Sequence, residues 1–158
     1  MKLTHLNTQG DAHMVDITNK STTVRSASAQ AEIVCSTTIM KALQDGTVPK
    51  GDVLAVARIA GIQAAKRVPD LLPLAHTIGV HGCEISIDLH ADHLTIESTV
   101  RTADRTGVEM EALTAVTVAA LTVIDMVKGV DRSAYIQHCW ITHKSGGRSG
   151  TWTRNTNA

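Results

Sequence analysis

Aromatic residues are nearly absent from this chain of 158 residues, which contains two tryptophans, one tyrosine and no phenylalanine. Hydrophobic residues still make up 43% of the sequence, so Ala, Val, Ile and Leu must fill the core. Proteins that bind single-stranded nucleic acid stack bases on aromatic side chains, and this chain has few of them. The composition therefore predicts an aliphatic core and disfavours a base-stacking surface.

The chain also lacks an excess of charge of either sign. Its 15 basic and 15 acidic residues give a formal net charge of zero and a pI near 7.1. Surfaces that bind nucleic acid or membranes are usually basic, so the totals favour neither partner. The N-terminus has no apolar signal segment, and the uncharged apolar run from 112 to 124 is shorter than the roughly 20 residues of a membrane span. We expect a cytoplasmic protein.

Metal-binding and disulfide motifs are missing as well. The three cysteines are widely spaced, odd in number and form no CxxC pair, which favours free, buried thiols in a reducing compartment. None of the eight histidines forms an HxxxH or HExxH motif. His90 and His93 flank a predicted hairpin turn and are expected at the surface. The sequence therefore predicts neither a metal site nor a resident cofactor.

The hydrophobic pattern predicts a single domain over 1–158, with an ordered core at about 14–150 and flexible ends. Alternation indicates strands, a 3.6-residue period indicates helices, and N-caps are expected within Ser36-Thr37-Thr38 and at Asp52. The expected elements are a strand at 24–35, helices at 36–43 and 53–67, a proline-bracketed loop at 69–76, a hairpin of 85–89 with 94–100, a long helix after 109, and a strand at 134–143. This order predicts a two-layer α+β sandwich of the split-βαβ kind.

The long helix carries charges only at its two ends. Glu109 and Glu111 stand at its start, and Asp125 and Lys128 stand at its end. The last two are three positions apart, so a helix places them on one face. Two interpretations remain open: the charges stabilise the helix dipole and form a surface ion pair, or they are an acid–amine site for proton transfer.

A glycine-rich segment near the C-terminus suggests an anion site. Lys144 precedes the string SGGRSG, in which Arg148 supplies a second cation. Backbone N–H groups and cations together bind phosphate, although such segments also occur as linkers. Lys50 adds a cation near a predicted turn. His76 follows a rigid Pro-Leu segment, so we expect it to be held in place for hydrogen bonding or acid–base chemistry.

Seven motifs stand out along the chain: MVDI at 14–17, KGDV at 50–53, ARIAGIQAAK at 57–66, LPLAH at 72–76, TGVEMEALTA at 106–115, DMVK at 125–128 and KSGGRSG at 144–150. Taken together and in this order, they resemble the molybdenum-cofactor biosynthesis protein C family of cyclic pyranopterin monophosphate synthases. Two departures are Ala75, where the family often has Cys, and Arg148, where Lys is common; Arg keeps the charge.

The resemblance implies an enzyme that converts 3′,8-cyclo-7,8-dihydro-GTP to cyclic pyranopterin monophosphate and releases pyrophosphate. It implies a ferredoxin-like sandwich, with an antiparallel sheet and helices packed on one face, assembled as a hexamer of three dimers. Asp125 and Lys128 match the catalytic residues, and Mg²⁺ with the triphosphate is left open. The implied substrate-binding positions are Leu74, Ala75, His76, Glu109, Met110, Glu111, Lys50 and Lys144, to which the charge argument adds Arg148.

Two rival functions remain: a non-catalytic pterin- or nucleotide-binding oligomer, and a structural oligomer. An acid–amine pair favours catalysis over both, because binding alone does not need it. Glu111 and Asp125 are fourteen positions apart, about 21 Å along a straight helix. One small pocket cannot gather both from one chain, which predicts a site at a subunit interface. The alternative is that the glutamates precede the helix on a loop that folds back.

Overall fold

The computed structural model describes residues 4–155. Within them, an antiparallel sheet of five strands has the order β2-β3-β1-β4-β5. The elements along the chain are β1 (Thr23–Val34), α1 (Thr37–Gln44), α2 (Val53–Ala65), α3 (Val68–Leu71), β2 (Gly82–Leu89), β3 (His93–Asp104), α4 (Glu109–Val127), β4 (Tyr135–Ser145) and β5 (Trp152–Thr153). The first strand is therefore central, between the third and the fourth.

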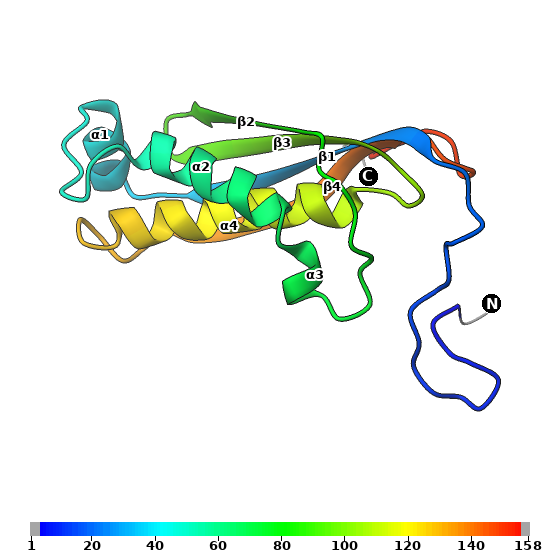
Figure 1. Cartoon of the computed structure of the whole chain (residues 1–158). Helices are drawn as coiled ribbons and strands as arrows, with labels where there is room; N and C mark the ends of the chain where they lie inside the picture. The colour runs from blue at the N-terminus through cyan, green and yellow to red at the C-terminus, as the bar shows by residue number, and fades with distance from the viewer. Residues whose placement is uncertain (1–3, 156–158) are drawn as a thin grey trace.

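Helices α2 and α4 lie side by side along one face of the sheet (Figure 1). The predicted α+β ferredoxin-like sandwich is thus confirmed. The side chains on the buried face of β1 are small: Ala27, Ala29 and Ala31 are fully buried beneath α4. Small residues also bring the two helices together: a Cβ added to Gly61 of α2 would lie 2.8 Å from the carbonyl oxygen of Ala115 in α4. Close packing of aliphatic groups replaces the missing aromatics.

Both predicted N-caps are confirmed. The Ser36 hydroxyl accepts from the Ile39 N–H at 3.3 Å, and the Asp52 carboxylate accepts from the Ala55 N–H at 2.9 Å. Helix α2 ends at Ala65 rather than at 67. The loop expected at 69–76 begins instead as the short helix α3, which accommodates proline in its first turn. The two-residue strand β5 was also missed, because it is too short to show alternation.

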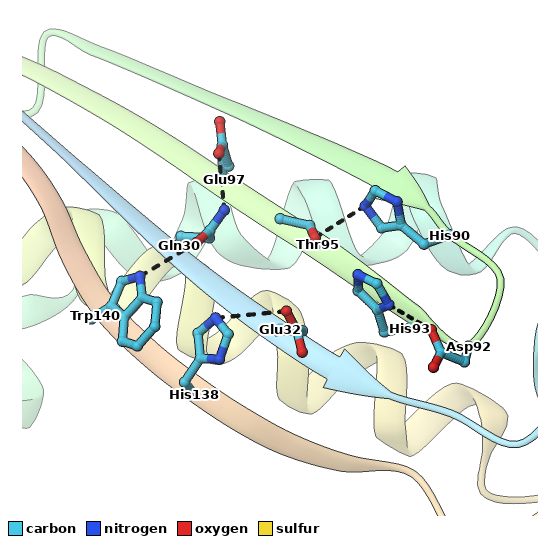
Figure 2. A network of polar contacts seen from close by, with 9 residues as sticks. All are labelled: Gln30, Glu32, His90, Asp92, His93, Thr95, Glu97, His138 and Trp140. Carbon is cyan, nitrogen blue, oxygen red and sulfur yellow. Dashed lines mark hydrogen bonds and ion pairs between the residues drawn. The ribbon is translucent and has the colours of Figure 1, made fainter. Parts of the chain in front are cut away.

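The opposite face of the sheet carries a polar network (Figure 2). Gln30 on β1 donates to Glu97 at 3.1 Å and accepts from the Trp140 indole at 3.3 Å. The His138 ring stacks on Trp140 with centroids 3.9 Å apart. At the hairpin, His90 is exposed as expected, whereas His93 is partly covered. Among residues 4–155, no group of three or more His, Cys, Asp and Glu side chains is arranged to hold a metal ion.

Helix α4 is long and apolar enough to cross a membrane by length and composition alone. Half of the most apolar part of this helix is buried inside the protein, and the helix contacts β1, β3, β4 and α2. A core helix of a folded domain has the same composition as a membrane span, and the packing of α4 is that of a core helix.

Candidate active site

Helix α4 places the predicted site residues at its two opposite ends. Glu109 and Glu111 lie in its first turn, Asp125 lies in its last turn and Lys128 caps it. The alternative in which the glutamates precede the helix is wrong, because the helix begins at Glu109. The two ends are about 21 Å apart. One chain therefore holds two polar clusters, which we call the glutamate end and the aspartate end.

The glutamate end opens into a hollow of about 780 Å³. Four stretches of chain form its walls: 20–26, 75–76, 106–111 and 144–149. Of the predicted substrate-binding residues, Leu74 is exposed but does not line the hollow, and Lys50 lies at the other end of the helix. The predicted residues that line it are Ala75, His76, Glu109, Met110, Glu111, Lys144 and Arg148.

Glu111 is buried, with 4% of its surface exposed. The pKa of its carboxyl is raised from 4.5 to about 7, mainly by burial, with a backbone hydrogen bond that lowers it and the charge of Glu109 that also raises it. A group with this pKa gives and takes protons near neutral pH. The Glu109 carboxylate folds over Gly107, where an added Cβ would lie 2.7 Å from the carboxyl carbon. Gly107 therefore makes the space that this side chain occupies.

His76 is held in place, as expected from its rigid surroundings. Its Nε2 lies 2.6 Å from the carbonyl oxygen of Val15. A carbonyl oxygen only accepts, so Nε2 carries the proton that is donated. In the neutral ring Nδ1 is then an acceptor, and it makes no hydrogen bond within residues 4–155. This nitrogen can accept a hydrogen bond from a molecule in the hollow that His76 lines.

The glycine-rich loop is packed against β1. Gly146 and Gly147 both have positive φ, 89° and 71°. A Cβ on Gly146 would collide with the Val24 carbonyl, and one on Gly147 would collide with the Arg25 guanidinium. The Lys144 ammonium donates to the Ser149 hydroxyl across the loop. The loop thus forms a fixed wall that carries two cations.

Two cationic residues of the hollow, Lys20 and Arg25, were not predicted from the sequence. Alternation placed Arg25 in a strand and indicated no role for it. The sheet register brings it to the site, because Thr23 pairs with Asp104 and Ser26 pairs with Ser145. The start of β1 therefore lies between the loop before α4 and the glycine-rich loop. Only long-range pairing shows this, so no local signal was available.

At the aspartate end, the Asp125 carboxylate bridges two ammonium groups. Lys128 lies 2.6 Å away and Lys50 lies 2.7 Å away. The hydrogen bonds from Lys128 and then Lys50 hold the pKa of Asp125 down at about 2, so it is charged at neutral pH. Lys50 also donates to the Asp125 carbonyl at 2.9 Å. Lys50, Lys128 and Arg132 line a second hollow of about 560 Å³.

These features define the class of protein. A glutamate that exchanges protons near neutral pH lies in a hollow with four cations, Lys20, Arg25, Lys144 and Arg148. An acid–amine pair lies at the far end of the same helix. Proton-transfer groups beside concentrated positive charge suit an α+β enzyme that acts on a small anionic molecule.

Comparison with known proteins specifies this class further. Residues 14–147 match the MoaC family. The cyclic pyranopterin monophosphate synthase of Streptomyces coelicolor is 51% identical over 154 residues, which cover 98% of this chain and 91% of that protein. Cyclic pyranopterin monophosphate synthase 2 of Mycobacterium tuberculosis is 51% identical over 153 residues, with 97% and 92% covered. The synthase of Thermoanaerobacter is 47% identical over 156 residues, with 98% and 99% covered. The chain belongs to the MoaC family.

Proposed function

We propose that this chain is a lyase that converts 3′,8-cyclo-7,8-dihydro-GTP to cyclic pyranopterin monophosphate, with release of pyrophosphate, in molybdenum cofactor biosynthesis. The observation that carries the proposal is the hollow that combines Glu111 with four cations. Rearranging the ring requires proton transfers, which Glu111, His76, Asp125 and Lys128 supply. A hydroxyl of the substrate loses its proton and bonds to the innermost phosphorus, which closes the cyclic phosphate as pyrophosphate leaves. The cations stabilise the negative charge that develops on pyrophosphate.

The proposed chemistry is tested by measuring cyclic pyranopterin monophosphate and pyrophosphate formed by the wild type and by Asp125→Asn. The amide keeps the shape of the carboxylate but loses the charge that bridges Lys50 and Lys128. We expect kcat to fall by about 10²-fold or more, the usual scale for an acid–base group. Asp45→Asn is the matched control, because Asp45 also pairs with a lysine at 2.6 Å, but that lysine, Lys41, lines neither hollow, whereas Lys50 and Lys128 line the second one. A folded Asp125→Asn protein with near-normal kcat contradicts the assignment.

The triphosphate end of the substrate is proposed to lie against Lys144, Arg148 and the glycine-rich loop. Lys20 and Arg25 support this position, because they add two cations to the same hollow. We expect Lys144→Ala to weaken inhibition by pyrophosphate about tenfold, the scale of a lost charge-assisted hydrogen bond. Lys41→Ala, on the surface, is the control. Equal pyrophosphate affinity in Lys144→Ala and wild type places the phosphates at the aspartate end instead.

We also propose that the complete site forms between two copies of the chain. Along α4, between the charged ends, the residues that are not buried carry no charge, and Leu121 is 54% exposed. An apolar helix stripe of this kind is usually covered by a partner. Antiparallel pairing of two α4 helices about a two-fold axis covers it and brings the glutamate end of one copy towards the aspartate end of the other. Three such dimers give the hexamer implied by the family resemblance.

The proposed setting is the cytoplasm, with no resident cofactor. Where Mg²⁺ takes part, we propose that it arrives on the triphosphate, whose oxygens are preferred ligands for this ion. Activity measured with EDTA and then with added Mg²⁺ tests this. A protein-bound metal that survives gel filtration and is required for turnover contradicts it.

A further inference from the structure

We propose that Arg25 is a positioning residue, which fixes the loop leading to the two glutamates relative to the glycine-rich loop. The inference rests on the proposed function, because it assumes that the proton-transfer groups and the phosphates occupy these two walls. Arg25 lies near the start of β1 and lines the hollow between the two loops. Its guanidinium contacts both walls.

On one side, the guanidinium holds the end of β3. Its Nε donates to the Asp104 carbonyl at 3.0 Å, and its Nη2 donates to the Arg105 carbonyl at 3.3 Å. The Asp104 carboxylate in turn accepts from the Arg105 N–H at 2.7 Å and from the Gly79 N–H at 3.2 Å. Only three residues, 106–108, separate this fixed point from Glu109 at the start of α4. Moving the two carbonyls therefore moves the start of the helix.

On the other side, the guanidinium supports the glycine-rich loop. A Cβ added to Gly147 would lie 2.8 Å from the Arg25 Cζ, and one added to Gly146 would lie 3.1 Å from the Arg25 Cα. The loop backbone thus rests directly on Arg25, and no side chain fits between them. Arg25 therefore lies between the glycine-rich loop and the end of β3 and contacts both.

The geometry requires arginine in particular. A guanidinium is planar and donates in a fixed fork, so it can bind two successive carbonyls while its face supports the loop. A lysine at this position keeps the positive charge but offers one compact ammonium on a flexible stem. Arg25→Lys therefore separates geometry from charge. A displacement of about 1 Å in a catalytic group can cost 10²-fold in rate.

The test measures kcat, KM and pyrophosphate affinity for Arg25→Lys, with Arg154→Lys as the matched control. Arg154, just after β5, also donates through Nε to a strand carbonyl, that of Ile141 in β4 at 2.8 Å, but it lines neither hollow. We expect Arg25→Lys to lower kcat about tenfold or more, with pyrophosphate affinity within about threefold of wild type because the charge is kept. Wild-type kcat in Arg25→Lys, or a loss confined to pyrophosphate affinity, overturns the inference.

A second pair of variants tests the same contact from the loop side, even if Arg25→Lys folds poorly. Gly147→Ala and Gly150→Ala impose similar backbone strain, at φ 71° and 65°, but only the first methyl meets Arg25, because the space around Gly150 is open. We expect Gly147→Ala to lose more kcat than Gly150→Ala. In the double variant Arg25→Lys/Gly147→Ala, the loss should be smaller than the sum of the two single losses, expressed as free energies. Equal losses in the two glycine variants overturn the inference. If the wild type itself forms no cyclic pyranopterin monophosphate, the proposed function fails instead.

Discussion

Glu111 shows how position alone turns a common side chain into a titrating group at neutral pH. The residue belongs to the first turn of α4, where a carboxylate is normally favoured by the helix dipole. Burial has the opposite effect and is the larger one, so the pKa rises to about 7. Asp125, at the exposed end of the same helix, has its pKa held at about 2 by two ammonium groups. The pKa values of the two carboxyl groups thus differ by about five.

This shift predicts a pH-dependent stability. The folded state binds the Glu111 proton more tightly than the unfolded state, in which the pKa of this carboxyl is 4.5. The contribution is fully present below pH 4.5 and is lost as pH rises through about 7, where the buried carboxylate is charged. Glu111→Gln is neutral throughout, so its unfolding free energy relative to wild type should increase over this range, by at most about 3 kcal/mol.

Urea unfolding of both proteins at several pH values, at one protein concentration, measures this difference. Glu84→Gln, at an exposed position on β2, is the control and should show little change relative to wild type over the same range. A difference between wild type and Glu111→Gln that does not vary with pH contradicts the raised pKa.

At the scale of elements, the contact between α2 and α4 determines where both ends of α4 lie. Gly61 allows that contact, since an added Cβ would lie 2.8 Å from the Ala115 carbonyl and would collide with the Ile85 side chain. Alanine favours a helix over glycine by about 1 kcal/mol, whereas overpacking costs about 1–3 kcal/mol. The clash is with backbone, so we expect Gly61→Ala to destabilise the protein.

The unfolding midpoint in urea measures the effect of Gly61→Ala. Gln63→Ala, at an exposed position on the same helix, is the control and should change stability by less than about 0.5 kcal/mol. A Gly61→Ala protein more stable than wild type would show that α2 moves away from α4 at little cost.

Local patterns predicted most elements, because each leaves a mark in the sequence: alternation for β2 and β3, and capping residues for α1 and α2. The four-residue α3 and the two-residue β5 are too short for any period. The same division holds for the site. The pairing of Asp125 with Lys128 follows from helical spacing, whereas that of Asp125 with Lys50, 75 positions away, depends on tertiary packing. Arg25 reached the hollow through sheet register, which the sequence does not show.

At the scale of the whole molecule, the proposed pairing of α4 with a second α4 has a definite register. If position 111 of one helix lies level with position 125 of the other, the two numbers at each level sum to 236, so Val118 lies level with Val118 of the second copy. A single substitution, Val118→Cys, should then form a disulfide between copies under mild oxidation. Val56→Cys, exposed on α2, should not, and the wild type controls for the native cysteines.

Complementation tests whether that interface completes the site. In a mixed dimer of Asp125→Asn and Glu111→Gln, one of the two sites regains both intact residues, while the other has neither. Random exchange of equal amounts makes half the dimers mixed, so about a quarter of wild-type activity should return. Mixing Asp125→Asn with Lys128→Ala should restore no activity. Both changes lie at the aspartate end, so every site in the mixture still contains one of the two substitutions. If mass measurements confirm exchange and the first mixture stays inactive, Glu111 and Asp125 do not act together across an interface.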